Sequence, residues 1–432
     1  MKQRVMRLLC PVFAVLMLTG AVGCASKPET DVDAQPASDT VATDTPSTEE
    51  PPKSAPADSL YRGPFGTKMY YSKEQTAESF HEHCAALEYE GYTRVFSNRI
   101  GDNEYASFRR EGETVYTYFT AYASEIRTIN DTVSTLTLPA EEQQYDKLTE
   151  TSVIQLAPDF YNDGSWGMGY LIQLEDSRYV VIDGGYEGNG TNANRILGLM
   201  ESMNRREDKK IVIAAWILTH DHPDHYSVFF DFARRLADRV TLEQVIVNTQ
   251  GRSDRGYLAT KDFRADIRRF GENVPLWIAQ VGQVFYLADA RFEILNTAFS
   301  VFPGQPNING TSLVFRMTAE GQSFLWTGDI ELETGEIVCR SFGDYLKSDI
   351  LQMPHHGYYE NCVAEEFYAT VDPIVLFWDT IQPNADDWYS KAETVRYAVD
   401  SLHVQETHVA DNKFTRIAFP YTVGAAEVLS VE

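Results

Sequence analysis

Three histidines and two aspartates fall within six consecutive residues, His220-Asp-His-Pro-Asp-His225. Imidazole and carboxylate groups together are the ligands that hold zinc, iron or manganese in hydrolytic sites. In an extended loop His220 and His222 point to the same side, so both can reach one metal ion. Pro223 is a favoured first residue of a helix, which would place Asp224 and His225 in the first turn, facing a second ion. The spacing therefore predicts a metal centre.

The segments on either side of this cluster are apolar. Residues 211–218 have the length and composition of a fully buried strand, and residues 226–237 those of a buried helix. Further strands are expected at 179–182, 245–247, 284–287, 291–295, 312–318, 323–327 and 349–352, with helices at 192–203, after Asp329 and after Glu360. This mixture of strands and helices favours an αββα sandwich, with the ligand site at the carboxyl ends of strands.

Four more motifs follow expected strands: Val180-Val-Ile-Asp-Gly-Gly185, Asn309-Gly-Thr-Ser-Leu-Val314, Phe324-Leu-Trp-Thr-Gly-Asp329 and Leu351-Gln-Met-Pro-His-His-Gly357. Together with the histidine cluster they resemble the H-x-H-x-D-H signature and the ordered motifs of the metallo-β-lactamase fold superfamily. The last three most resemble the extracellular hydrolase domain of the ComEC/Rec2 competence proteins. The resemblance covers residues 150–432, and it implies an α+β fold, the αββα metallo-β-lactamase sandwich.

The resemblance implies a ligand set for two divalent metal ions. His220 and His222 would hold the first ion, and Asp224 and His225 would hold the second. Asp329 would bridge the two ions through its carboxylate. Zinc is the favoured ion, with manganese and iron as alternatives.

The pair His355 and His356 is ambiguous. Gly357 lets this loop turn sharply, and adjacent histidines in an extended loop point in opposite directions. One of the two would complete the second metal site, and the other would contact the substrate or act as a general acid. We expect both, with Asp224, to take part in catalysis. Asp183 would orient a ligand imidazole, or it would serve as a structural turn residue.

The first metal site departs from the broader family. Many members supply a further histidine between the cluster and the bridging aspartate, whereas this chain has none between His225 and His355. ComEC-like members share that absence and have an Asn/Ser-rich motif instead, as at Asn309 and Ser312, which we expect to support the ligands. Water or an asparagine oxygen would then complete the first site. An enzyme with a single ion is the alternative.

The expected activity follows from the ions. A metal-bound hydroxide attacks a phosphoryl or carbonyl centre, and a two-ion site suits in-line displacement at phosphorus. The sequence therefore favours a phosphodiesterase that acts on an envelope-derived, nucleotide or nucleic-acid substrate. A β-lactamase or another amide or ester hydrolase is the alternative enzyme. A binding module that has lost turnover is the alternative from another class.

The first 23 residues have the pattern of a bacterial export signal. Basic residues at 2, 4 and 7 precede the short apolar stretch 8–18, and Ala21-Val-Gly-Cys24 resembles a lipoprotein cleavage site. An ordinary signal peptide is the alternative. We expect an exported protein on the bacterial cell envelope, anchored to the membrane by lipid on Cys24. Residues 24–59, which are rich in Pro, Ser, Thr and acidic residues and lack aromatic ones, are expected to be a disordered linker.

Residues 60–145 are expected to form a small α+β accessory domain, with a helix at 72–88 and strands at 92–96, 104–109 and 114–122. This segment has no motif that indicates chemistry. The formal net charge of the chain is −26, which repels polyanions at long range and gives no reason to expect strong nucleic-acid binding. A small or envelope-derived substrate therefore fits better than long DNA. The sequence does not indicate an oligomeric state.

Overall fold

The structure is a computed structural model, and it describes residues 59–132, 134, 139, 141–157, 167–187, 190–249, 257–301, 307–360 and 362–429. Residues 51–432 form one compact unit. The expected signal peptide, Cys24 and the linker as far as residue 58 lie outside the described residues. Among the helices of the described part, none combines the length and the apolar character that crossing a membrane requires.

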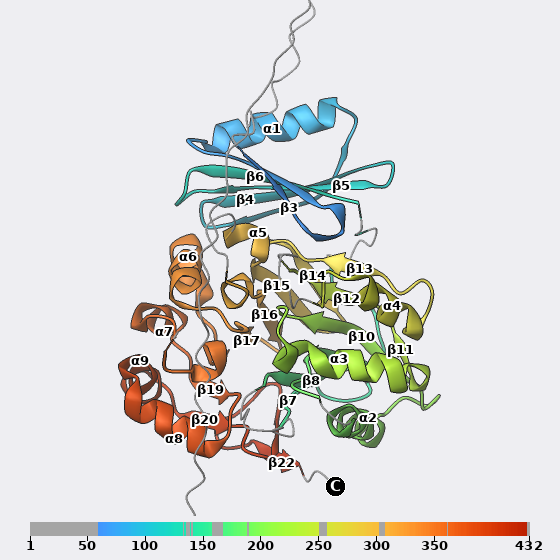
Figure 1. Cartoon of the computed structure of the whole chain (residues 1–432), viewed down its shortest axis with the longest axis vertical. Helices are drawn as coiled ribbons and strands as arrows, with labels where there is room; N and C mark the ends of the chain where they lie inside the picture. Colours follow the sequence, from blue (N-terminus) through green and yellow to red (C-terminus); the bar gives the residue numbers. More distant parts are fainter. Residues whose placement is uncertain are drawn as a thin grey trace, which may run out of the picture. The chain divides into compact units, whose positions relative to one another are not determined.

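Residues 59–131 form an antiparallel sheet with one helix on it, which we call the accessory sheet (Figure 1). The strands run in the order β1-β2-β6-β5-β4-β3 and are β1 Ser59–Arg62, β2 Lys68–Ser72, β3 Thr93–Ile100, β4 Asn103–Arg110, β5 Glu113–Thr120 and β6 Glu125–Asp131. Helix α1 (Ala77–Tyr89) begins after Thr76, whose hydroxyl accepts a hydrogen bond from Ser79 N, and it buries Phe80 against Phe108. The sequence predicts α1 and β3 to β5, and the structure adds β1, β2 and β6.

A nine-stranded sheet carries the histidine cluster. Its order is β13-β12-β10-β9-β8-β7-β21-β22, and β11 also pairs with β10. The strands are β7 Ser152–Gln155, β8 Gly169–Gln173, β9 Tyr179–Asp183, β10 Ile211–Leu218, β11 Val240–Leu242, β12 Val245–Val247, β13 Leu276–Ile278, β21 Phe414–Ala418 and β22 Glu427–Leu429. All eight residues of β10 are buried, as the apolar run predicts. Helices α2 (Thr191–Met203), α3 (Pro223–Arg235) and α4 (Lys261–Phe270) share an apolar cluster with this sheet.

A seven-stranded sheet follows in the order β14-β15-β16-β17-β18-β19-β20. Its strands are β14 Val284–Leu287, β15 Ala290–Asn296, β16 Val314–Ala319, β17 Gln322–Trp326, β18 Ile350–Gln352, β19 Val375–Trp378 and β20 Glu406–Val409. Helices α6 (Leu332–Phe342), α7 (Glu365–Val371), α8 (Gln382–Lys391) and α9 (Glu393–Arg396) share an apolar cluster with it, and the short helix α5 (Ala298–Val301) follows β15.

The two larger sheets meet through a third apolar cluster, which contains side chains of both. Tyr170 of β8 makes edge-to-face contacts with Phe324 and Trp326 of β17, with ring centroids 5.7 Å apart in each pair. Because the helices pack on the outer faces, the layers are helix, sheet, sheet and helix (Figure 1). The predicted α+β αββα sandwich is therefore confirmed.

Candidate metal centre

The predicted site residues come from the carboxyl ends of β9, β10, β17 and β18. Asp183 is the last residue of β9, and His220 lies two residues beyond β10. Asp329 lies three residues beyond β17, and His356 lies four residues beyond β18. Since β9 and β10 belong to one sheet and β17 and β18 to the other, the site requires both sheets.

One group of donor atoms consists of His220, His222 and Asp329. His220 Nε2 lies 3.0 Å from His222 Nδ1 and 3.5 Å from Asp329 Oδ2. The side chains of His220 and Asp329 are almost fully buried. Ligands about 2 Å from a tetrahedral zinc ion lie roughly 3.3 Å from one another, so these separations fit one shared ion.

A second group consists of Asp224, His225, His356 and the same Asp329. Asp329 Oδ2 lies 3.2 Å from His225 Nε2 and 3.4 Å from His356 Nε2. His356 Nε2 also lies 3.3 Å from Asp224 Oδ2. Within each group the donor atoms all lie within 4.8 Å of one another. The structure therefore places Asp329 where the sequence analysis expects it, between two sets of donors.

His225 and His356 each turn Nε2 toward the other donor atoms. The opposite ring nitrogen, Nδ1, contacts another residue in each case. His225 Nδ1 lies 2.7 Å from Asp183 Oδ2, and that carboxylate also accepts hydrogen bonds from the backbone and the hydroxyl of Thr219, each at 2.7 Å. His356 Nδ1 lies 3.2 Å from the carbonyl oxygen of Asp379. Hydrogen bonds of this kind fix the tautomer and leave Nε2 free to bind a metal ion. Asp183 thus lies where it could orient the His225 ring, which is one of the two roles predicted for it.

The loop after β18 distinguishes the two adjacent histidines. His355 and His356 both have left-handed backbone conformations, with φ of 49° and 55°, which is uncommon for residues other than glycine and is concentrated at functional sites. The turn directs His356 to the donor atoms and leaves His355 outside both groups. His355 Nε2 instead lies 3.2 Å from Asn309 Nδ2. Of the two adjacent histidines, His356 is thus the one that lies with the donor atoms, and His355 lies outside both groups.

Charge at the site favours a cation. Burial lowers the pKa of His220, and His225 lowers it further, so His220 is in the neutral form that metal binding requires. Burial opposes charge on His356, but Asp329 and Asp224 outweigh it and raise the pKa to about 10. Burial also opposes ionisation of Asp329, yet the surrounding histidines hold its pKa well below the usual range. The buried carboxylates therefore need positive charge beside them.

This donor set fits divalent cations. Asp329 Oδ1 and His356 Nε2 are buried and have no hydrogen-bond partner among the described residues, although unpaired buried polar atoms are rare in proteins. The imidazole and carboxylate donors are also those that zinc, manganese and iron accept. A cation at either group would take the place of the protons that the histidines otherwise hold.

The Asn/Ser motif lies beside Asp329 and His355. Asp329 N donates a hydrogen bond of 3.0 Å to Ser312 Oγ. Asn309 Nδ2 lies 2.8 Å from Glu331 Oε1, and Asn309 Oδ1 is buried without a hydrogen-bond partner among the described residues. Ser312 thus contacts Asp329 directly, whereas Asn309 contacts His355 and Glu331.

Sequence reasoning missed Glu331 and Asp379. Glu331 Oε1 lies 3.7 Å from His355 Nδ1, and its place two residues after Asp329 is the only signal in the sequence. Asp379 is fully buried and accepts hydrogen bonds from Tyr170 and Gln155; burial raises its pKa to about 7 against the effect of these bonds. It directly follows the apolar strand β19, which the sequence analysis does not predict.

Asp221, within the histidine cluster, has a different role. Its Oδ1 accepts hydrogen bonds from Tyr257 N at 2.7 Å and Leu258 N at 2.9 Å. The carboxylate therefore holds the segment before α4 and belongs to neither donor group.

Comparison with known proteins points to one superfamily. The family model for the metallo-β-lactamase superfamily matches residues 167–373, which contain every predicted site residue. ComE operon protein 3 of Bacillus subtilis (strain 168) is 28% identical over 160 residues. The match covers 37% of this chain and 19% of that protein, so the chain spans less than a fifth of the relative's length.

Two solved structures give weaker similarities. The metallo-β-lactamase fold protein YhfI from Bacillus subtilis is 14% identical, with a TM-score of 0.41, and the match covers 61% of this chain and 97% of that chain. Zn(2+)-bound PqqB from Methylobacterium extorquens is 12% identical, with a TM-score of 0.30 and coverage of 47% and 72%. The family model and the ComE relative support a metallo-β-lactamase superfamily domain over residues 167–373.

Proposed function

We propose that this protein is a metal-dependent hydrolase that cleaves phosphodiester bonds. The observation that carries the proposal is the sharing of Asp329 by two groups of buried donor atoms. Two cations held side by side in this way suit in-line displacement at phosphorus. Bound divalent cations would lower the pKa of water and neutralise charge that develops on the phosphoryl group. Zinc is the favoured ion, and manganese or iron would accept the same donors.

The residues around the site have separate tasks in this proposal. The first ion would be held by His220, His222 and Asp329, and the second by Asp224, His225, His356 and Asp329. Asp183 and the carbonyl group of Asp379 would keep two of the imidazole rings in place, since each accepts a hydrogen bond from a ring Nδ1. Because these supports are buried, little reorganisation of the site would accompany the reaction.

His355 is the group that we propose contacts the substrate. The Asn309 amide faces its Nε2 at 3.2 Å, so Nε2 accepts that hydrogen bond and Nδ1 carries the ring proton. Nδ1 has no hydrogen-bond partner among the described residues, and Glu331 Oε1 lies 3.7 Å away. In this neutral tautomer the Nδ1–H group can donate a hydrogen bond to an oxygen of the substrate, and the ring can orient the phosphoryl group without a net change of its own charge.

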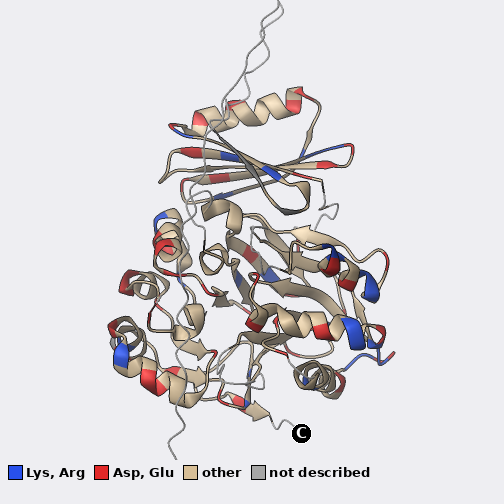
Figure 2. Ribbon diagram, in the orientation of Figure 1, with Lys and Arg blue, Asp and Glu red and all other residues tan. Residues whose placement is uncertain are grey.

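The substrate that we propose is small or derived from the cell envelope. A net charge of −26 disfavours long polyanions at a distance. Basic residues do gather in the last turns of α3 and α4 (Figure 2), where the helix dipole favours them. The basic N-terminal segment and the Cys24 motif support a further part of the proposal, an exported protein anchored by lipid at the bacterial envelope.

Substrate hydrolysis by the metal-loaded protein tests the proposal. We expect turnover of bis(p-nitrophenyl) phosphate that is lost on chelation and restored by zinc or manganese, with little turnover of the β-lactam nitrocefin. Turnover of nitrocefin or of p-nitrophenyl esters alone would favour the alternative, an amide or ester hydrolase. Metal binding without turnover of any of these probes would favour a binding module, and the absence of metal binding would contradict the site itself.

A further inference from the structure

The accessory sheet is attached to the sandwich at Phe299 of α5. Arg127 Nη1 donates a hydrogen bond of 2.6 Å to the carbonyl oxygen of Phe299, and Tyr118 OH donates one of 3.3 Å to the same atom. Gly63 packs on the other side, since a Cβ atom there would come within 2.8 Å of the Phe299 ring. The carbonyl group of Phe299 is therefore fixed by two side chains of the accessory sheet.

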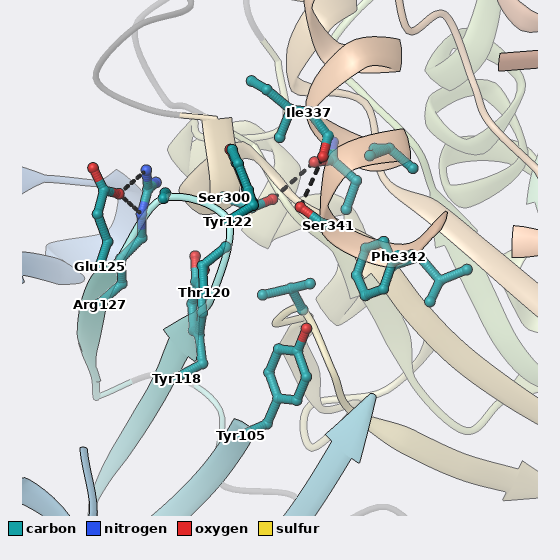
Figure 3. A pocket seen from close by; sticks show the side chains of 15 residues that line it. Tyr105, Tyr118, Thr120, Tyr122, Glu125, Arg127, Ser300, Ile337, Ser341 and Phe342 are labelled. Carbon is teal, nitrogen blue, oxygen red and sulfur yellow. Dashed lines mark hydrogen bonds and ion pairs between the residues drawn. The ribbon is translucent and has the colours of Figure 1, made fainter. Parts of the chain in front are cut away.

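Arg127 is itself held rigidly. Its side chain is 10% exposed and pairs with Glu125 at 2.8 Å (Figure 3). The space between the accessory sheet and the sandwich at this point is about 20 Å³, close to the size of one water molecule. A charged hydrogen bond in such a confined place is strong and directional, and it ties the position of α5 to the accessory sheet.

Hydrogen bonds continue from α5 to the candidate metal centre. Ser300 Oγ, one residue after Phe299, lies 2.8 Å from Asn296 Oδ1. Asn296 Nδ2 donates to the carbonyl oxygen of Ser312 at 2.9 Å, and Ser312 Oγ accepts from Asp329 N at 3.0 Å. Asn296, Ser312 and Asp329 are each no more than 2% exposed. Hydrogen bonds, continued through the Phe299–Ser300 peptide link and through Ser312 itself, thus join the accessory sheet to the backbone of Asp329.

The Ser312 segment also contacts the other half of the site. Leu313 N donates a hydrogen bond of 2.9 Å to the carbonyl oxygen of Thr219, the residue before His220. Gly328 packs so closely that a Cβ atom there would lie 2.9 Å from Ser312 Cβ and 3.2 Å from Thr219 Cβ. A shift of Ser312 would therefore change the distance between His220, which one sheet supplies, and Asp329, which the other sheet supplies.

We propose that Arg127 is a positioning residue for Asp329, and that the accessory sheet acts in this way as part of the metal centre. The inference rests on the proposed function in one respect, the role of Asp329 as a ligand. Arg127 acts through Phe299, Asn296 and Ser312, and it touches neither the substrate nor the metal site. Physical contact along a series does not by itself establish energetic coupling, so variants must measure it.

The test measures zinc affinity of the full chain by competition with a chelator, together with the melting temperature of the metal-free protein. Arg127→Lys keeps a charge for Glu125 but loses the fork that also reaches Phe299, and Ser300→Ala breaks the series at its next contact. Asn98→Ala is the matched control, because Asn98 Nδ2 donates a hydrogen bond across the same two parts of the protein, to the carbonyl oxygen of Gly282.

We expect Arg127→Lys and Ser300→Ala each to weaken zinc binding by roughly three- to thirty-fold. Asn98→Ala should keep the wild-type zinc affinity, even if its melting temperature falls as much as that of Arg127→Lys or Ser300→Ala. Unchanged affinity in both variants, or an equal loss in Asn98→Ala, would overturn the proposal. Asp329→Ala separates this failure from that of the proposed function: if it binds zinc like the wild type, the assignment of the site is wrong, whereas if it loses zinc while Arg127→Lys does not, only the positioning role is wrong.

Discussion

Replacing Asp329 with alanine should remove a donor from both groups at once. The first group would keep only His220 and His222, and the second would keep three donors. Catalytic zinc sites generally have three protein ligands, so the first group falls below that number and the second just reaches it. The metal content should therefore fall from about two ions per chain to about one or fewer.

His222→Ala is the comparison, because it removes a donor from the first group alone. In that variant the second ion should bind with wild-type affinity. In Asp329→Ala the second ion should bind more weakly by about 10- to 100-fold or more. That range is the usual effect of removing a residue that only orients a ligand, and Asp329 is itself a donor. Elemental mass spectrometry after dialysis at a fixed free zinc concentration measures the count, and circular dichroism checks that each variant is folded. Two ions per chain in Asp329→Ala would refute the reasoning.

Three further outcomes are expected. Asp183→Asn removes the charge that faces His225 Nδ1 at 2.7 Å and should weaken zinc binding by about 10- to 100-fold in chelator competition; an unchanged affinity would mean that Asp183 is only a turn residue. Zinc at 100 times its dissociation constant should stabilise the fold by about 2.7 kcal/mol, so a melting temperature that does not depend on zinc would contradict binding to the folded state. Burial opposes ionisation of Glu293, but Arg291 and Arg316 lower its pKa, so its stabilising effect is present above the unfolded pKa and is lost as the pH falls through the folded one. Glu293→Gln should cost roughly 3–5 kcal/mol at pH 7 and less in acid, and urea unfolding that shows the same loss at pH 7 and pH 3 would contradict this.

The part of the site that could be predicted from sequence is the part that local structure determines. The eight apolar residues of β10 can only be buried, and Pro223 sets the start of α3 after a loop of four residues. The strand, the loop and the first helical turn therefore place the histidine cluster without any distant contact. Asp329 and His356 reach this cluster only through the packing of the second sheet, and the family resemblance was needed to connect them with it.

The remaining features depend on contacts that the sequence does not record. The choice between His355 and His356 follows from two consecutive left-handed residues, which no local pattern favours. Strand β6 has little strand signal in its sequence, Glu-Ile-Arg-Thr-Ile-Asn-Asp, because it is mostly polar and its two isoleucines do not alternate with polar residues. Arg127 is nevertheless buried there, because Glu125 and the distant carbonyl group of Phe299 accept its hydrogen bonds.

The division of the donors between two sheets has a consequence for mechanical and proteolytic resistance. His225 and Asp329 are 104 positions apart in the chain, so an ion held by both would act as a reversible cross-link around a long loop. A covalent link that closes a loop of that length restrains the unfolded chain by about 4.7 kcal/mol in simple entropy models. An ion at this site would then also clamp the two halves of the sandwich together, and proteases should cleave the protein more easily whenever it was stripped of metal.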